Sequence, residues 1–184
     1  MEIIKTDIDG VFIIEPKVFG DSRGYFFESF NAREFALKTS LDVNFVQDNE
    51  SMSHYGVLRG LHFQNPPYAQ SKLVRVVQGK VVDVAVDIRR GSPTYGKYVM
   101  AELTGENHRQ FFVPRGFAHG FAVLSDVAVF QYKCDNFYAP ASEGAIAWND
   151  PDIAIPWPVP ASDVELSEKD KKHPFLKDIV SPFE

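Results

Sequence analysis

The sequence contains a single cysteine, Cys134, among its 184 residues. One cysteine cannot form an intrachain disulfide, which favours a reducing compartment. No apolar run approaches the ~20 residues of a membrane-spanning helix. The first ten residues also lack the apolar stretch of a secretory signal peptide. We therefore expect a cytoplasmic location and no association with a membrane.

The sequence also lacks a run of lysine and arginine residues, and its net charge is −6. Because general nucleic-acid binding depends on a basic surface, nucleic acid is disfavoured as a partner. The acidic balance does not exclude a small anionic ligand, since a few converging arginine and lysine side chains can bind a diphosphate.

No internal repeat, low-complexity segment or Gly/Ser linker divides the chain. Its length and a hydrophobic content of 45% are those of one globular domain, so we expect residues 1–184 to form a single domain. Sixteen phenylalanines and seven tyrosines suit a β-rich fold, because aromatic side chains pack well on pleated sheets.

Short segments of β-like sequence recur along the chain with turn residues between them, a pattern typical of an all-β sandwich or barrel. The expected strands are residues 11–14, 25–30, 43–46, 57–63, 72–78, 81–88, 98–103, 110–113, 119–124 and 127–134. The four prolines between residues 149 and 160 exclude a helix or a central strand there and predict an extended surface segment.

Two short helices are expected. The first follows Asn31, an acceptable N-cap, and has Phe35 and Leu37 available for packing. The second starts at Ser167 and runs to about residue 172, because Pro174 ends it.

Residues 114–120 have the pattern P-x-G-x-x-H, which resembles the second motif of the cupin β-barrels. A tight Pro/Gly turn can deliver His119 from the start of a strand into a barrel. A simple turn followed by a half-buried histidine fits the same residues equally well, so this motif alone does not decide the fold.

The first cupin motif of metal-binding members supplies two histidines and a glutamate. The corresponding positions here are His62, Gln64 and Lys72, the last standing seven residues before Gly79. An ammonium group cannot ligate a metal ion and repels one, so we expect a cupin-like fold without a metal. Lys72 alone could be a solvated strand residue, but it shares a strand face with Val74 and its apolar neighbours.

A lysine inside a polar barrel can stabilise the negative charge that develops on a substrate oxygen when a proton is removed beside a ketone. His62 is the natural base, because the unperturbed pKa of a histidine, about 6.5, lies near the working pH. Inversion of configuration needs a second group on the opposite face, and Tyr132 is a candidate. From its position alone, a core tyrosine with a bonded hydroxyl is the better interpretation of Tyr132.

Six segments resemble those of the dTDP-4-dehydrorhamnose 3,5-epimerase family in order and spacing. They are residues 24–28, 47–51, 58–64, 72–76, 82–89 and 114–121. The resemblance extends from near residue 10 to the C-terminal tail. It implies a cupin jelly-roll fold, an antiparallel β-sandwich or barrel with a few short helices.

The resemblance also implies catalytic roles. His62 matches the family's proton-abstracting base and Tyr132 its proton donor, with Lys72 placed to stabilise the enolate. Asp170 resembles the carboxylate that orients and polarises the histidine. Asp83 lies in a strand that matches another carboxylate near the site, although an outward-facing strand aspartate is an equally good interpretation.

Further residues carry over as ligand contacts. The resemblance places Arg23, Arg59, Lys72 and His119 around the diphosphate and the sugar. It implies other polar contacts from Glu28, Gln47, Asn49, Glu143 and Lys169. It also implies that the thymine ring is sandwiched between Phe26 and Tyr138. Flat aromatic faces suit a base without specific hydrogen bonds. Any one of the charged residues, taken alone, is more often a solvated surface charge.

One local pattern conflicts with these assignments. Strict alternation along a strand places Arg59 and His62 on opposite faces, whereas the resemblance places both at the site. A bulge at Gly60 would re-aim one of the two side chains.

The implied activity is epimerisation of dTDP-4-dehydro-6-deoxy-D-glucose at C3 and C5, giving dTDP-4-dehydro-L-rhamnose, by an isomerase that needs no cofactor. A 3- or 5-monoepimerase, a ketoisomerase and a non-catalytic sugar-nucleotide-binding cupin are the alternatives. The family is dimeric, and exchange of N-terminal strands would bring Arg23, Phe26 and Glu28 into a neighbouring pocket.

Overall fold

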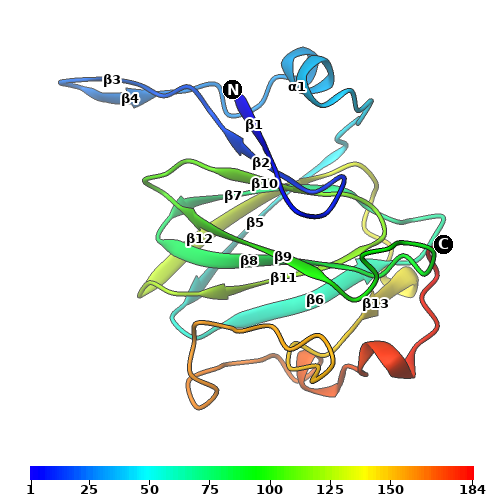
Figure 1. Ribbon diagram of the computed structural model, residues 1–184. Coiled ribbons are helices and arrows are strands. Elements are labelled where there is room, and N and C mark those ends of the chain that lie inside the picture. Colours follow the sequence, from blue (N-terminus) through cyan, green and yellow to red (C-terminus); the bar gives the residue numbers. More distant parts are fainter.

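The computed structural model describes residues 1–184 and contains two antiparallel β-sheets that face each other (Figure 1). In spatial order, the six-stranded sheet consists of β1 (Glu2–Lys5), β2 (Phe12–Glu15), β10 (Gln110–Val113), β7 (Lys72–Gln78), β12 (Val127–Cys134) and β5 (Gln47–His54). The five-stranded sheet consists of β13 (Glu143–Ala145), β6 (Leu58–Gln64), β11 (Phe117–Val123), β8 (Lys80–Asp87) and β9 (Tyr98–Thr104).

This arrangement confirms the expected all-β, jelly-roll type of fold. No strand belongs to both sheets, so the molecule is a sandwich and not a barrel closed by hydrogen bonds. A sandwich leaves space between its sheets wherever the side chains of the two inner faces do not interdigitate.

The main core lies between the sheets, and β8 shows how the sequence builds it. Val81 and Ala85 point inward and join a cluster of 15 buried residues that includes Phe121 and Phe130. Val84, on the opposite face of β8, packs in a second cluster under the C-terminal tail. Both faces of this central strand are therefore apolar, as in a strand covered on two sides.

The C-terminal part of the chain covers the outer face of the five-stranded sheet. It contains the proline-rich segment, which is neither helix nor strand as expected, and the 3₁₀ turns η2 (Asp170–Lys172) and η3 (Leu176–Asp178). A further turn, η1 (Pro140–Ser142), precedes β13. The helix expected from Ser167 to residue 172 is only the turn η2, which begins at Asp170 and ends, as expected, before Pro174. The tail thereby places Asp170 beside β6.

The first expected helix is present as α1 (Ala32–Thr39), which packs on the outer face of the six-stranded sheet (Figure 1). The side chain of Asn31 accepts a hydrogen bond from the Glu34 amide at 3.1 Å, as an N-cap should. Phe35 is buried, but the expected packing of Leu37 is wrong, because its side chain is exposed. Two residues correspond to about 200° around a helix, so these side chains face opposite ways.

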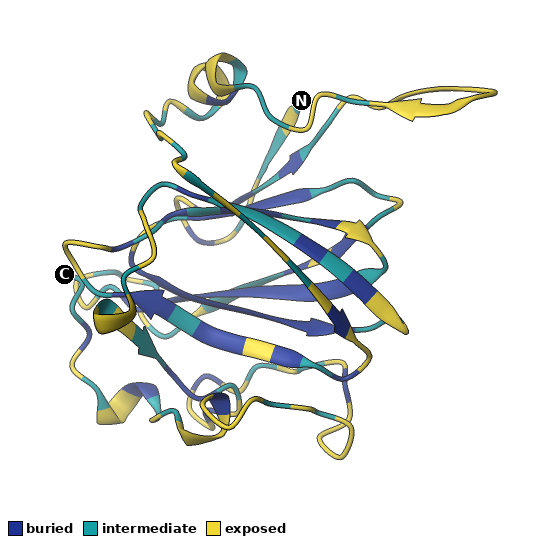
Figure 2. Cartoon of the chain, turned by 180° about the vertical axis from the view of Figure 1, so that it is seen from behind, coloured by how far each residue is buried: buried dark blue, intermediate teal, exposed yellow.

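Two expected strands are misplaced. Residues 43–46 form no strand, and β5 begins at Gln47 instead, because a strand that lines a polar cavity carries few apolar residues. The strand expected at 25–30 ends at Phe26, where β4 (Gly24–Phe26) pairs only with β3 (Phe19–Asp21). This hairpin projects from the body and is exposed along its length (Figure 2). No helix is long and apolar enough to span a membrane.

Candidate active site

A cavity of about 580 Å³ lies between the two sheets. A second hollow of about 290 Å³ adjoins it, since His62, Lys72, Tyr132 and Glu143 line both. The expected site residues that line one or both are His62, Tyr132, Asp170, Lys72, Gln47, Asn49, Arg59, His119, Tyr138, Glu143 and Lys169. The two hollows form one continuous polar cleft, which we call the inter-sheet cleft.

A bulge in β6 brings Arg59 and His62 to the same cleft. His62 lies opposite His119 on β11, but Arg59 lies opposite Phe121, so three steps along β6 match two along β11. The intervening Gly60 has a φ of 145°, a conformation that only glycine adopts readily. The bulge expected from the sequence is therefore present, and it removes the conflict over alternation.

Asp170 holds the imidazole of His62. The distance from His62 Nε2 to Asp170 Oδ1 is 2.7 Å, and the Asp170 amide bonds to the Ser167 hydroxyl at 3.1 Å. Burial alone would raise the pKa of Asp170, but the hydrogen bonds from His62 and His173 outweigh it, so the pKa lies below its usual range. An ionised carboxylate behind the ring fixes its tautomer and stabilises the imidazolium that forms when His62 takes a proton.

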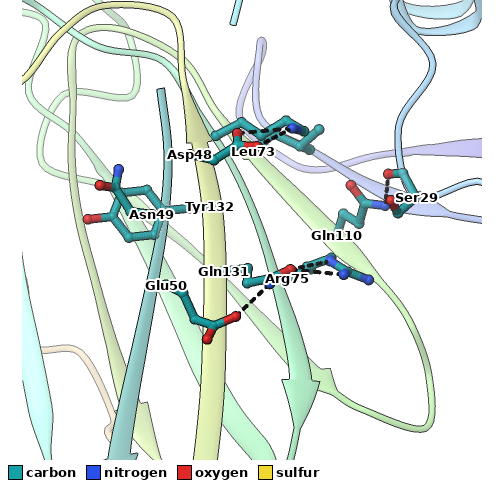
Figure 3. A pocket seen from close by; sticks show the side chains of 10 residues that line it. Ser29, Asp48, Asn49, Glu50, Leu73, Arg75, Gln110, Gln131 and Tyr132 are labelled. Carbon is teal, nitrogen blue, oxygen red and sulfur yellow. Dashed lines mark hydrogen bonds and ion pairs between the residues drawn. The ribbon is translucent and has the colours of Figure 1, made fainter. Parts of the chain in front are cut away.

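Tyr132 faces the cleft from the other sheet. It lies directly opposite Asn49 in the pairing of β12 with β5. The side chains of Tyr132 and Asn49 lie next to each other, and Arg75 lies at a distance from both (Figure 3). Burial raises the pKa of the Tyr132 phenol, which therefore stays protonated and able to donate. The ammonium of Lys72 lies 5.8 Å from the centroid of the Tyr132 ring.

A buried pair of side chains forms the floor of the cleft. His119 Nε2 lies 2.7 Å from Asp83 Oδ1, and both side chains are almost fully enclosed. Asp83 Oδ2 is the only buried side-chain oxygen or nitrogen without a hydrogen-bond partner. Burial raises the pKa of Asp83 and lowers those of His119 and Lys72. Asp83 therefore points inward to His119, which lines the cleft, although Asp83 itself lines neither hollow; the outward-facing interpretation of this residue is wrong.

Polar side chains line one mouth of the cleft. Gln47 bonds to Asn49 at 3.0 Å and accepts a hydrogen bond from the Tyr138 amide at 3.0 Å. Glu143 on β13 pairs with Lys169 in the tail. Because these groups come from three separate segments, only the folded chain brings them together.

Three expected ligand contacts lie elsewhere. Arg23 and Phe26 are on the projecting hairpin, where the Arg23 side chain is 88% exposed and pairs only with Asp21. Glu28, just after the hairpin, is exposed as well. None of the three lines the cleft of its own chain.

The side chains that could geometrically hold a metal ion are His62, Asp170 and His173, whose candidate ligand atoms lie within 4.8 Å of one another. Their contacts with Asp170 are 2.7 and 3.0 Å. Two ligands on one tetrahedral zinc ion lie about 3.3 Å apart, from bond lengths of roughly 2.0 Å. The three side chains thus have the spacing of a hydrogen-bonded group.

A further hollow of about 300 Å³ lies on the six-stranded sheet (Figure 3). Its charged and amide groups bond to one another: Arg75 donates to Gln131 at 2.9 Å, and Gln131 donates to Glu50 at 2.6 Å. A hollow whose polar groups are already paired offers no poised acid or base, so the inter-sheet cleft remains the candidate site.

His173 is the residue at the site that the sequence did not indicate. It bonds to the same Asp170 oxygen as His62, at 3.0 Å. Its position three residues after Asp170 is the only sequence signal, and that spacing has no meaning until Asp170 is known to face the cleft.

Comparisons with known proteins identify the family of this chain. The family model described as dTDP-4-dehydrorhamnose 3,5-epimerase matches residues 5–178. The dTDP-4-dehydrorhamnose 3,5-epimerase of Shigella flexneri is 58% identical over 170 residues, 92% of this chain and 93% of that protein.

Solved structures match over nearly the whole chain. A dTDP-6-deoxy-D-glucose-3,5-epimerase from Legionella pneumophila, in complex with dTDP-4-keto-L-rhamnose, superposes with a TM-score of 0.94 at 52% identity, covering 97% of this chain and 94% of that one. A 3'-monoepimerase from Streptomyces bikiniensis, in complex with dTDP-quinovose, gives a TM-score of 0.88 at 35% identity, covering 95% and 87%. The chain belongs to the dTDP-4-dehydrorhamnose 3,5-epimerase family.

Proposed function

We propose that this chain epimerises dTDP-4-dehydro-6-deoxy-D-glucose at C3 and C5 to dTDP-4-dehydro-L-rhamnose by acid–base catalysis. The observation that carries the proposal is the placement of a base and an acid on opposite walls of one cleft. His62, backed by Asp170, stands on the five-stranded sheet, and Tyr132 stands on the six-stranded sheet. Inversion at carbon needs this opposition, because the proton leaves one face of the sugar ring and another returns to the other face.

The first half-reaction removes the C5 proton. The neutral imidazole of His62 takes this proton. The C5–H electron pair forms a double bond between C4 and C5 of the sugar, and the C4 carbonyl oxygen becomes an enolate oxygen. Lys72 stabilises that oxygen, because its ammonium group lies in the cleft. Tyr132 then protonates C5 from the opposite face, and C4 becomes a carbonyl again. His62 then loses its proton to solvent and the Tyr132 phenolate regains one. The neutral imidazole can now remove the C3 proton, and inversion at C3 is complete when a proton returns to the opposite face and C4 is again a carbonyl.

The buried pair beneath Lys72 supports this role. Lys72 has no carboxylate within 4 Å, so it forms no ion pair that a substrate oxygen would have to displace. Asp83 and His119 lie close enough to Lys72 for their charges to interact with it, and Asp83 favours the protonated form of Lys72. A protonated lysine without an ion-pair partner is free to interact with the negative charge that develops on the enolate oxygen.

The nucleotide part of the substrate would lie toward the mouth of the cleft, with Arg59 near the diphosphate. Tyr138 is 55% exposed at that mouth and offers one flat face for the thymine ring. We expect the other face to be covered by Phe26 of a second copy, because Phe26 lies on the projecting hairpin. In this scheme residues 1–184 act as a single domain in a homodimer, and a cytoplasmic location stays a prediction.

A single-site epimerase is the second candidate, since a 3'-monoepimerase shares this fold at 35% identity. Turnover in heavy water separates the alternatives, because each inverted carbon takes one deuterium from solvent. A 3,5-epimerase labels both C3 and C5, and a monoepimerase labels one of them. A ketoisomerase gives a product with a moved carbonyl, and a binding protein incorporates no deuterium.

The matched control is His62→Ala, which should bind dTDP normally but incorporate no deuterium at either carbon. NMR of the product and calorimetry with dTDP measure the two properties. Normal labelling by His62→Ala would refute the proposed base.

A further inference from the structure

We propose that His173 is a positioning residue that sets the base strength of His62 through the carboxylate they share. The inference rests on the proposed function, in which His62 is the base. His173 lies in the tail, between η2 and Pro174, and touches the reacting groups only through Asp170.

The geometry of the three side chains carries this inference. Asp170 Oδ1 lies 2.7 Å from His62 Nε2 and 3.0 Å from His173 Nε2, so one oxygen serves both rings. The two imidazoles meet edge to face, with centroids 5.5 Å apart and planes at 88°. The side chain of His173 is only 10% exposed, whereas that of His62 is 38% exposed and open to the cleft.

Sharing one oxygen has a direct chemical consequence. A carboxylate oxygen that accepts a second hydrogen bond spreads its charge over two donors, so each bond is weaker. The attraction of Asp170 for the imidazolium form of His62 falls accordingly. The second hydrogen bond, from His173, therefore weakens the hold of Asp170 on the His62 ring.

Charged groups from several elements surround the two rings. The titratable groups that line the two hollows beside these rings, apart from Asp170, are His54, Arg59, Lys72, His119, Tyr132, Glu143, Glu165, Lys169 and Lys172. Glu143 is already paired with Lys169. The lysines oppose a positive charge on either imidazole. Asp170, which bonds to both rings, favours such a charge, and Glu143 lies close enough to His62 to favour it on that ring.

The carboxylate is also fixed in orientation by its neighbours. The Asp170 backbone amide bonds to the Ser167 hydroxyl at 3.1 Å, and its side chain is 6% exposed. His173 lines a hollow of about 480 Å³ between the tail and β13, and His62 lines the same hollow. Loss of this second donor leaves the whole charge of Oδ1 to His62.

The test compares His173→Leu, which removes the donor, with His173→Gln, whose amide nitrogen can take the place of Nε2. The acid limb of the pH profile of kcat/KM reports the protonation of the free base. In His173→Leu this limb should move to higher pH by ~0.5–1 unit, because Asp170 then stabilises the His62 imidazolium more strongly. His173→Gln should restore the wild-type limb. Lys171→Leu, in the same turn, serves as a control with an unchanged limb.

A second readout separates this inference from the proposed function. NMR titration of the His62 ring needs no substrate and should show the same upward shift in His173→Leu and its reversal in His173→Gln. If His173→Leu does not fold, His173→Asn provides the test, because its shorter amide cannot reach Oδ1. An unmoved acid limb with unmoved ring titration in a folded donor-less variant overturns the role of His173, whatever the reaction proves to be.

Discussion

At the residue scale, Tyr132 can be tested apart from its neighbours. Tyr132→Phe keeps the ring but removes the hydroxyl, so inversion at C5 should fall by about 10²–10⁴-fold. Proton abstraction by His62 does not need that hydroxyl, so exchange of the C5 proton with solvent should persist. Product analysis by NMR in heavy water measures both quantities.

The matched control for this change is Tyr68→Phe, since Tyr68 is 46% exposed and lines neither hollow of the cleft. It should leave both rates unchanged. Unimpaired inversion at C5 in Tyr132→Phe would mean that another group returns the proton.

Sequence reasoning reached some of these residues and missed others for a physical reason. The sequence indicates His62 because it retains a histidine of a known metal-binding motif, and Lys72 because it replaces the glutamate of that motif. For Asp83 the sequence leaves both interpretations possible, because alternation does not say which face of a strand is the inner one. His173 was missed, since its partner ring on β6 is more than a hundred positions away, and only the folded tail brings them together.

At the scale of single elements, the bulge in β6 sets the direction of two site residues. A Cβ atom at Gly60 would lie 2.7 Å from Gly120 Cα and would require a positive φ. Gly60→Ala should therefore lower the free energy of unfolding by about 2–4 kcal/mol. It should also lower turnover, because Arg59 and His62 no longer face the same cleft.

Urea unfolding and steady-state kinetics measure these two effects. Gly91→Ala is the control, since the nearest atom to its added Cβ would be 3.7 Å away, an ordinary contact. A Gly60→Ala protein as stable and active as the Gly91→Ala protein would show that β6 does not need its bulge.

The loop after β8 provides a prediction about pH. Arg89, Ser92 and Thr94 bond to the fully buried carboxylate of Asp87 at 2.6 to 3.0 Å. Burial alone would raise the pKa of Asp87, but these bonds outweigh it and lower the pKa from 3.8 to about 2. Because the folded state lowers the pKa of Asp87, its ionised carboxylate stabilises the fold at pH values above the pKa of the unfolded chain. This stability is lost as the pH falls from about 4 to about 2.

Asp87→Asn should accordingly destabilise the protein by about 2 kcal/mol near neutral pH. The difference from wild type should shrink as the pH falls below about 4. Urea unfolding at a series of pH values, down to the lowest at which the wild type folds, measures it. A difference that stays constant with pH would show that the Asp87 charge contributes nothing.

Elements were easier to predict than their ends. The strands that form the core, such as β8 and β11, show apolar residues and were found nearly in place. By contrast, β5 has the sequence QDNESMSH, whose inward side chains bind polar partners. A strand that lines a polar cleft gives up the apolar alternation by which strands are recognised.

At the scale of the whole molecule, the projecting hairpin predicts how two copies cooperate. If it completes a neighbour's site, then a chain with Arg23→Ala and Phe26→Ala and a chain with His62→Ala should each be nearly inactive alone. A mixed dimer would contain one site with both His62 and an intact hairpin. Its activity should be about half that of the wild-type dimer, because one of two symmetric sites is whole.

Co-expression of the two chains with different tags yields the mixed dimer, and its rate per dimer is the measurement. Mixed dimers as inactive as the two parents would show that the hairpin serves the site of its own chain. A protein that runs as a monomer in light scattering would argue against exchange altogether.

The arrangement of the sheets is what the sequence could not supply. An all-β fold followed from the pattern of short strands and turns. The pairing of β12 with both β5 and β7 joins segments far apart in the chain, and no local pattern contains that information. The same holds for the absence of hydrogen-bonded closure between the sheets.

The two proposed catalytic groups stand on different sheets, and their separation therefore depends on the hydrophobic interior. Beside them, Phe121 on β11 stacks on Phe130 on β12 with centroids 4.1 Å apart, which makes this pair a spacer between the two walls. Any substitution that thins or thickens the spacer changes the gap that a sugar ring must fill. Turnover can thus be tuned by residues that never meet the substrate, and relatives that prefer other sugars need not differ at the reacting side chains at all.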